Sequence, residues 1–181
     1  MDLSPSRLFN VAYVLFKNVL ILAIILIIYH LFIGTIFVVS GVSMENNFHT
    51  GQWVYVNRIS YLASQPHKGE VTVTKFPGDP KNKKFVKRLI GLPGEKIEIV
   101  DSKVFVNGNE LIESYIDKRL IFSENLSRQL GSNEYFLMGD NRAESHDSRI
   151  WGPASRKDLI GKATFVLYPL SDFGAIPAPA Y

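Results

Sequence analysis

One long apolar run lies near the start of the chain, and the remainder alternates between short apolar and polar stretches. No charged side chain occurs from Asn18 to Val39. As an α-helix, this run of roughly 22 residues would measure about 33 Å, close to the ~30 Å hydrocarbon core of a bilayer. It is too long for the apolar part of a cleaved signal sequence. We therefore predict a transmembrane helix over residues 18–39, with a cleaved signal peptide or a buried helix as the alternatives.

Basic residues lie on only one side of this run. Arg7 and Lys17 precede it, and the next lysine or arginine is Arg58. Positively charged flanks of membrane helices stay in the cytoplasm. The sequence therefore predicts a single-pass protein of the cell (plasma) membrane, with residues 1–17 in the cytoplasm and the chain beyond the run outside it.

Beyond Ser40 the pattern becomes that of short β-strands. We predict strands at residues 53–56, 71–76, 85–90, 96–100, 103–106, 135–138 and 163–168. The polar stretch 110–132 has no clear period, and we interpret about 95–134 as an inserted subregion. The predicted fold class is all-β, an antiparallel folded-over sheet or barrel over residues 40–175, behind one transmembrane helix. Residues 176–181 alternate proline and alanine and are expected to form a flexible tail.

Composition excludes several classes of function. The net charge of +3 without a dense basic face argues against nucleic-acid binding, although it tolerates an anionic lipid surface. The absence of cysteine excludes thiol catalysis, disulfides and thiolate metal sites. The histidines outside the apolar run are His49, His67 and His146, and their spacing is not that of metal ligands. We therefore expect no metal and no cofactor.

A candidate nucleophile, Ser43, follows the apolar run within a few residues. A serine hydroxyl needs a neighbouring base to take its proton. His146 has an acid beside it, Asp147, but adjacent residues of a strand point to opposite faces. Glu45 stands where the nucleophile elbow G-x-S-x-G needs its second glycine. A Ser-His-Asp triad is thus an alternative without support from the pattern.

Lys87 is the other candidate base, because it lies within an apolar strand pattern. Alternation places Lys87 on one face with Phe85 and Leu89. Burial of a lysine disfavours its charged form and lowers its pKa, and a neutral amine beside a serine is a workable base. The alternative is a solvated lysine on an edge strand.

Four segments, taken in order, resemble the motif boxes of type I signal peptidases. They are residues 40–47, 51–58, 85–94 and 139–152. The resemblance extends from the apolar run to about Tyr168. It implies a membrane-anchored serine endopeptidase on an all-β fold, which removes signal peptides from exported preproteins after A-x-A-like sites.

The resemblance also implies roles for individual residues. Ser43 matches the nucleophile and Lys87 the general base of a Ser-Lys dyad. Ser145 matches the serine that orients the lysine amine, and Met44 a residue that shapes the substrate site. Gly139 matches a glycine that lets the backbone pass close to the base. The charged residues expected to brace the site through ion pairs are Arg88, Asp140, Asp147 and Arg149.

The chain departs from the family pattern at several positions. Asn46 and Asn47 replace the proline and threonine of the usual S-M-x-P-T. Proline would fix the turn after the nucleophile, whereas asparagine tolerates turns but fixes less. Gly41 takes a position where some members carry a hydroxyl residue that completes the oxyanion hole. Loss of such a hydrogen-bond donor can cost ~3 kcal/mol of transition-state stabilisation. Gln52 replaces an acid, and Ala143-Glu144 replace Asp-Asn.

The implied partners are preprotein signal peptides and the lipid bilayer, with the secretion translocon as a further candidate. An extended substrate suits strand addition to a sheet edge, and small pockets would select small side chains. Phe48, Trp53 and Phe76 could form an apolar lip toward the membrane, or pack in the core. Two rival functions stay open: a Ser-Lys protease that cleaves itself or a regulatory protein, and a catalytically idle, membrane-tethered β-domain that binds exported chains.

Overall fold

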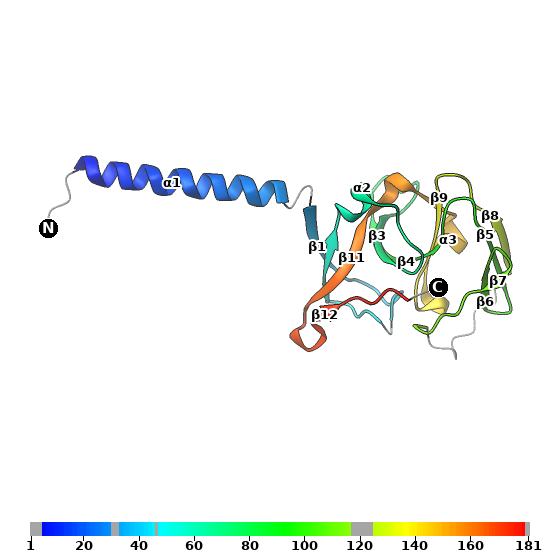
Figure 1. Ribbon diagram of the computed structural model, residues 1–181. Helices are drawn as coiled ribbons and strands as arrows, with labels where there is room; N and C mark the ends of the chain where they lie inside the picture. The colour runs from blue at the N-terminus through cyan, green and yellow to red at the C-terminus, as the bar shows by residue number, and fades with distance from the viewer. Residues whose placement is uncertain (1–4, 30–32, 46, 117–124, 180–181) are drawn as a thin grey trace.

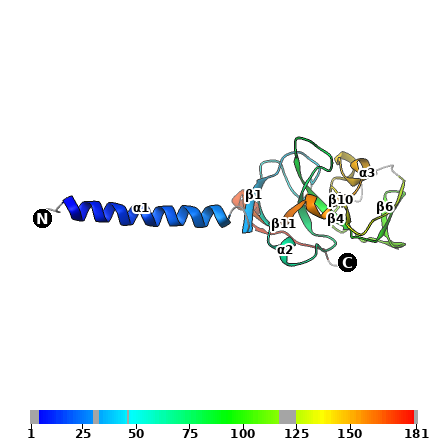
Figure 2. The same ribbon diagram turned by 90° about the horizontal axis from the view of Figure 1, so that it is seen from above.

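A long N-terminal helix leads into a β-rich body in the computed structural model, which describes residues 5–29, 33–45, 47–116 and 125–179 (Figure 1). Helix α1 (Pro5–Ile28) projects away from the body, and β1 is the first element of the body that the chain enters (Figure 2). The span Arg7–Ile28 has a mean hydropathy of 2.7 and none of it is buried. It is long and apolar enough to cross a membrane.

The predicted bounds of the apolar helix, residues 18–39, are wrong at both ends. The helix begins at Pro5 because Arg7 and Lys17 are straight-chain residues with good helix propensity, so their charges do not interrupt it. It ends at Ile28, and Gly34–Val38 form strand β1, which pairs antiparallel with β2 (Trp53–Asn57). The β-branched and aromatic residues of β1 favour a strand once a partner is present.

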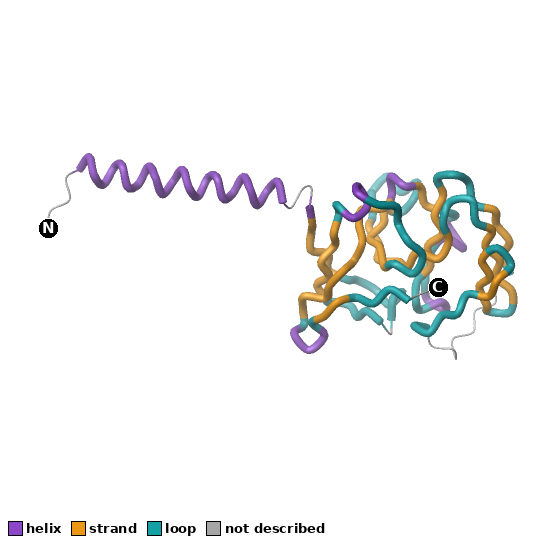
Figure 3. The backbone as a smooth tube through the Cα atoms, viewed as in Figure 1, coloured by secondary structure: helices purple, strands orange, loops and turns teal. Residues whose placement is uncertain are grey.

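Among the described residues the main sheet has eight strands, and the all-β antiparallel prediction is confirmed. Its order is β1-β2-β11-β3-β4-β9-β10, and β12 also pairs with β11. Each of these pairs is antiparallel. The sheet curves around the body, with loops and short helices at its margins (Figure 3). The strands not yet given bounds are β3 (Val71–Lys75), β4 (Lys84–Gly91), β9 (Glu134–Met138), β10 (Ala154–Ser155), β11 (Leu159–Tyr168) and β12 (Gly174–Ala175).

A second sheet has, within the part of the chain that the structure describes, four strands in the order β7-β6-β5-β8. It is formed by β5 (Lys96–Val100), β6 (Lys103–Val106), β7 (Asn109–Glu110) and β8 (Leu126–Gln129). Asn107-Gly108 form the hairpin turn between β6 and β7, and both residues have positive φ, 52° and 81°, which suits asparagine and glycine. Strand β8 lies in the stretch predicted to be irregular. Its polar side chains are mostly exposed, so hydrophobic alternation could not reveal it.

The helices of the body are short. They are α2 (Ser60–Ala63), α3 (Ser148–Trp151) and the 3₁₀ turns η2 (Arg142–Glu144), η3 (Arg156–Asp158) and η4 (Leu170–Asp172). Such single turns carry no apolar periodicity that a sequence pattern could detect. The Asp147 carboxylate caps α3 by accepting from the Arg149 N–H, which fixes the chain that follows β9.

A buried apolar cluster joins the main sheet to the loop between β1 and β2, residues 39–52, called here the 39–52 loop. Met44 and Phe48 enter this cluster from the loop and are each 2% exposed. Phe48 is therefore a core residue, and of the two alternatives left open for it the structure supports core packing over an exposed lip. Trp53 is 47% exposed and its ring packs against Tyr168, with centroids 5.6 Å apart.

The start of the predicted flexible tail is packed. The Ile176 N–H donates to the Thr164 carbonyl at 2.9 Å, and the Ile176 side chain packs against the main cluster. Apolar burial at Ile176 outweighs the disorder expected from proline and alanine content. The tail prediction is therefore wrong for residue 176, and residues 180–181 lie outside the described residues.

Candidate active site

Ser43 lies in a tight turn of the 39–52 loop. The Glu45 N–H donates to the Val42 carbonyl at 3.1 Å, and the Phe48 N–H to the Met44 carbonyl at 2.9 Å. Gly41 has φ of +95°, a conformation that favours glycine. Its N–H donates to the Thr50 hydroxyl, and the Thr50 hydroxyl donates back to the Gly41 carbonyl, which closes the loop. The buried side chain of Met44 then holds Ser43 at the surface of the core.

Strand β4 brings Lys87 to this turn. Lys87 Nζ lies 2.6 Å from Ser43 Oγ and 3.1 Å from Ser145 Oγ. Strand β4 pairs with β3 on one side and with β9 on the other. Lys87 is 1% exposed, so the alternative of a solvated edge-strand lysine is wrong. Three segments far apart in the sequence thus meet at one amine.

The surroundings of the Lys87 amine favour its neutral form. Burial lowers the pKa of Lys87 from 10.5 to about 8, because a charged amine loses its hydration there. Asp147 acts to raise the pKa, Arg149 acts to lower it, and Asp140 acts to raise it. Desolvation is the larger effect, so about one tenth of the lysine is uncharged at pH 7 and about half at pH 8.

The segment after β9 holds Ser145 against the amine. The Gly139 N–H donates to Asp147 Oδ2 at 2.9 Å. Arg149 binds the same carboxylate through Nε at 2.8 Å and Nη2 at 2.9 Å, and Nη2 also reaches the Arg142 carbonyl. Burial acts to raise the pKa of Asp147, but the Arg149 hydrogen bonds and charge keep that pKa below its usual value. The carboxylate therefore stays ionised and the turn around Ser145 stays braced.

Arg88 and Asp140 form a second ion pair beneath the site. Arg88 Nε and Nη2 donate to the two Asp140 oxygens at 2.9 and 2.7 Å, and both side chains are at most 3% exposed. Arg88 Nη1 donates to the Gly69 carbonyl at 2.8 Å. Because Arg88 follows Lys87 in β4, its side chain lies on the opposite face of the strand. The pair therefore supports the strand and does not touch the Ser43 hydroxyl.

The structure brings together all the residues predicted for the site. Ser43, Met44, Lys87, Ser145 and Gly139 surround the amine and the hydroxyl, and Gly41 lies in the turn before Ser43. The ion pairs predicted to brace the site join Arg88 to Asp140 and Arg149 to Asp147.

Several further residues at the site were not predicted from the sequence. The Asn141 side chain donates to the Val42 carbonyl at 3.1 Å, and its backbone N–H to the Ser43 carbonyl at 3.1 Å. Arg142 is buried and makes a bidentate pair with Glu113, with one bond of 2.7 Å. The centroid of the Tyr115 ring lies 4.0 Å from the Arg88 guanidinium carbon, Cζ. Glu113 and Tyr115 come from a stretch without a strand pattern, so no local signal marked them.

The alternatives to lysine gain no support from the geometry. The His146 ring packs against the Phe76 ring, with centroids 5.7 Å apart. Ser43 Oγ is hydrogen-bonded to Lys87 instead. Within residues 5–29, 33–45, 47–116 and 125–179, no group of three or more His, Asp or Glu side chains is arranged to hold a metal ion.

A cleft of about 230 Å³ opens beside Ser43. Its walls come from the end of β1 and the turn that follows, and from the start of β4. The residues lining it are Phe37, Val39, Ser40, Gly41, Ser43, Met44, Lys83, Lys84, Phe85 and Val86. Strand β4 pairs with β9 only from Arg88 onward, so backbone groups before Arg88 face the cleft without a β9 partner. An extended peptide could lie in this cleft with its carbonyl carbon at Ser43.

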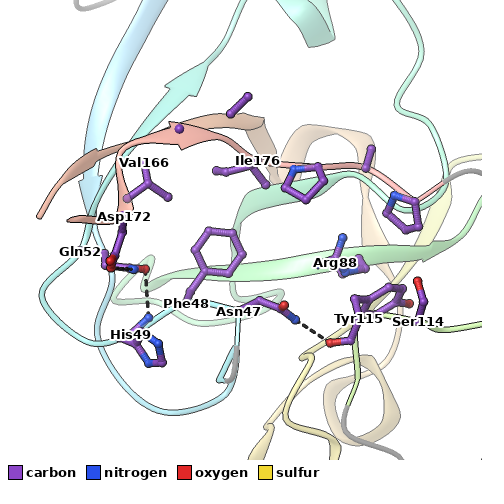
Figure 4. A pocket seen from close by; sticks show the side chains of 15 residues that line it. Asn47, Phe48, His49, Gln52, Arg88, Ser114, Tyr115, Val166, Asp172 and Ile176 are labelled. Atoms are coloured by element: carbon purple, nitrogen blue, oxygen red, sulfur yellow. Dashed lines mark hydrogen bonds between the residues drawn. The ribbon is translucent and has the colours of Figure 1, made fainter. Parts of the chain in front are cut away.

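A larger cavity of about 400 Å³ lies behind the 39–52 loop (Figure 4). Asn47, Phe48, Arg88 and Tyr115 line it, together with the segment 174–179. Figure 4 shows hydrogen bonds from Asn47 to Tyr115 and between His49, Gln52 and Asp172. Neither Ser43 nor Lys87 lines this cavity, so the chemistry belongs to the smaller cleft.

Comparison with known proteins shows the family and the fold of this chain. Residues 12–168 match the family described as "Signal peptidase, peptidase S26". The chain is 29% identical over 166 residues to a signal peptidase I of Bacillus licheniformis, which covers 86% of this chain and 88% of the relative. It is 32% identical over 167 residues to a signal peptidase IB of Staphylococcus aureus, covering 83% and 86%. A crystal structure of a signal peptidase I from Enterococcus faecalis V583 is similar, with TM-score 0.50, 27% identity, and coverage of 56% of this chain and 98% of that one.

Proposed function

This chain belongs to the signal peptidase I family, a family of serine hydrolases, and from that premise we propose that it cleaves signal peptides from exported preproteins through a Ser43–Lys87 dyad. The observation that carries the proposal is the 2.6 Å separation of Lys87 Nζ and Ser43 Oγ. Removal of signal peptides is what family membership implies. The identity of the dyad and the cleavage site are the proposed parts.

In the proposed mechanism the neutral Lys87 amine takes the Ser43 proton as Ser43 Oγ attacks the scissile carbonyl. The tetrahedral intermediate collapses to an acyl-enzyme, and the Lys87 ammonium returns the proton to the leaving amine of the mature protein. Lys87, neutral again, then activates the water that hydrolyses the ester. The Ser145 hydroxyl oxygen accepts a hydrogen bond from the Lys87 amine and keeps the amine directed at Ser43.

The oxyanion needs donors near Ser43. Among the described residues, no acceptor is paired with the Ser43 backbone N–H, so it is available to the developing oxyanion. Gly41 has no side-chain hydroxyl, and its N–H is already bound to Thr50. The Ser43 N–H is therefore the proposed protein donor at this position.

The cleft also supports a preference for small side chains. An extended substrate between β1 and β4 would alternate its side chains between the wall and the solvent. The wall is formed by bulky residues such as Phe37, Met44 and Val86, which leave little room for a large side chain. Alanine or another small residue at alternate positions before the cut, the A-x-A pattern, fits such a wall.

Membrane anchoring is indicated by the apolar helix α1 together with the family. A single pass with the N-terminus in the cytoplasm is proposed from Arg7 and Lys17. Exposed apolar side chains lie on the body at Trp53, Tyr168, Leu170 and Phe173, where they could contact the bilayer. Protease added outside intact cells or spheroplasts should digest the body; complete protection of the body would reverse the proposed orientation.

The function is tested with the full chain purified in detergent and a labelled preprotein. We expect wild type to release a mature protein whose new N-terminus follows an A-x-A site, and Ser43→Ala and Lys87→Met to release none. Lys157→Met, at an exposed position, is the matched control and should stay active. Cleavage by Ser43→Ala at the wild-type rate would refute the nucleophile.

The rival functions give other results in the same assay. An idle binding domain would retain the preprotein without cutting it, and a self-cleaving or regulatory protease would leave the preprotein intact while cutting itself or another membrane protein. The present proposal is favoured because both reacting groups are in contact and the base is buried.

A further inference from the structure

The side-chain amide of Asn47 makes two hydrogen bonds to buried or fixed acceptors. Asn47 Nδ2 donates to the Tyr115 carbonyl at 2.8 Å and to Asp140 Oδ2 at 2.9 Å. Both partners can only accept, so the orientation of the amide is determined by them and both of its hydrogens are used. Asn47 lies at an exposed position beside the larger cavity (Figure 4). Its side-chain nitrogen nevertheless binds the Asp140 carboxylate, which is 1% exposed.

The acceptors of Asn47 belong to a rigid group of side chains. Asp140 is held by Arg88 through two hydrogen bonds, and the Arg88 guanidinium lies over the Tyr115 ring. The Tyr115 hydroxyl donates to Glu113 at 2.6 Å, and Glu113 is in turn paired with the buried Arg142. A side chain that is hydrogen-bonded to this group is held as rigidly as the group itself, because moving buried, paired charges apart costs free energy.

This attachment connects the two reacting residues through a short path. Asn47 follows Ser43 by only four positions, and its N–H donates to the Met44 carbonyl at 3.0 Å, which closes the intervening turn. Asp140 binds Arg88, and Arg88 is the neighbour of Lys87 in β4. The path Asn47–Asp140–Arg88 thus joins the loop that carries the hydroxyl to the strand that carries the amine. Asn141 holds the other side of the turn at Val42 and Ser43.

We propose that Asn47 is a positioning residue, whose two amide hydrogen bonds hold the Ser43 hydroxyl at the Lys87 amine. They supply the rigidity that a proline would give the turn in the usual S-M-x-P-T motif. The inference rests on the proposed function of Ser43 and Lys87. A small displacement of a nucleophile from its base is costly, since misplacement of about 1 Å can reduce a rate 100-fold.

The test compares Asn47→Leu with Asn47→Thr in the full-length enzyme. Leucine has the shape of asparagine without its donors, and threonine offers one donor. We expect Asn47→Leu to lower kcat for preprotein cleavage at least tenfold with KM within about twofold, and Asn47→Thr to lie between it and wild type. Asn133→Leu, at an exposed position in the turn before β9, is the matched control and should behave as wild type.

A purely structural role gives a different result. In that case Asn47→Leu would lower the melting temperature, but kcat per folded enzyme would stay at the wild-type value, and this would overturn the proposal. Equal kcat for the leucine and threonine variants would also overturn it, because the donor would then be irrelevant.

A second readout separates this inference from the proposed function. Acylation of Ser43 by p-nitrophenyl acetate, followed by mass spectrometry, needs no preprotein. If wild type acylates but cleaves no preprotein, the proposed substrate is wrong while the Asn47 comparison is still decided by the acylation rates. Slower acylation in Asn47→Leu supports positioning, and equal rates, or no acylation of Ser43 in wild type, contradict it.

Discussion

Gly139 lies so close to Ser145 that a methyl group on Gly139 would overlap the Ser145 hydroxyl. The same methyl group would also overlap the backbone carbonyl oxygen of Ser43. The Gly139 N–H is meanwhile fixed by the Asp147 carboxylate, so the backbone cannot easily withdraw. Glycine is needed here for space, and its φ is not in the left-handed region.

Gly139→Ala should therefore inactivate the enzyme without unfolding it. The added methyl group must push away Ser145, Ser43 or both, and each movement separates a hydroxyl from the Lys87 amine. We expect kcat/KM to fall by about 100-fold or more, as for a misplaced nucleophile. Gly174→Ala is the matched control, because a methyl group there meets nothing within 4 Å. Wild-type kcat/KM in Gly139→Ala would show that the contact is unimportant.

The rate should depend on the protonation of Lys87. Only the neutral amine can accept the Ser43 proton, and burial lowers its pKa to about 8. We expect kcat/KM to rise about tenfold per pH unit below pH 8 and then to level off, so that pH 6 gives about one hundredth of the maximum. Initial rates between pH 5.5 and 10 measure this, in buffers of constant ionic strength. A maximum already reached below neutral pH would indicate a carboxylate or histidine base.

The same buried lysine should make the fold less stable at low pH. In the unfolded chain Lys87 keeps its charge until the pH approaches its ordinary pKa of 10.5. In the folded protein its pKa is about 8, so Lys87 loses the charge at lower pH. Below pH 8 the fold therefore carries a buried charge that costs ~3 kcal/mol, and this cost disappears as pH rises from 8 to 10.5. Lys87→Met should raise the free energy of unfolding at pH 6 and much less at pH 10.5. Denaturant titrations of wild type and variant at both pH values measure the difference; an equal effect at both would contradict it.

The ion pair of Arg88 and Asp140 should show strong coupling. Arg88→Met leaves the Asp140 carboxylate buried without its guanidinium and should cost ~3–5 kcal/mol of unfolding free energy. Asp140→Leu should cost a similar amount, whereas the double variant should lose much less than the two costs together. The exposed pair of Lys103 and Glu110 is the control, with an expected coupling below ~1 kcal/mol. Additive losses at Arg88 and Asp140 would mean that the pair is not coupled.

Hydrophobic alternation predicted the strands that line the core. Residues 53–56 fall within β2, where burial alternates along the strand. Residues 85–90 fall within β4, which is buried throughout from Val86 to Gly91, and its β-branched and aromatic residues favour a strand. The same method failed where burial did not follow a local period. Strand β8 is polar and exposed, and β1 continues an apolar run that the pattern assigned to a helix. Ile176 is held by a backbone hydrogen bond to Thr164 of β11, which no local period indicates.

The site was predicted unevenly for a similar reason. The resemblance to signal peptidases located Ser43, Lys87 and Ser145, which lie within its motif boxes. Glu113 and Tyr115 could not be predicted, since they act only through contacts with Arg142 and Arg88 that the fold creates. Asn47 departs from the motif in the sequence, but only the fold shows that its side-chain amide donates to the Tyr115 carbonyl and the Asp140 carboxylate.

By itself the sequence determined that there is an apolar segment, where several of the core strands lie, and which residue types are capable of the chemistry, because these depend on composition and local period. Only the tertiary structure decided that an amine 44 positions from a hydroxyl along the chain lies 2.6 Å from it. It also decided that the amine is buried, which lowers its pKa to about 8. Distance and dehydration depend on how β3, β4 and β9 pack together with the 39–52 loop, and a linear pattern does not specify that packing.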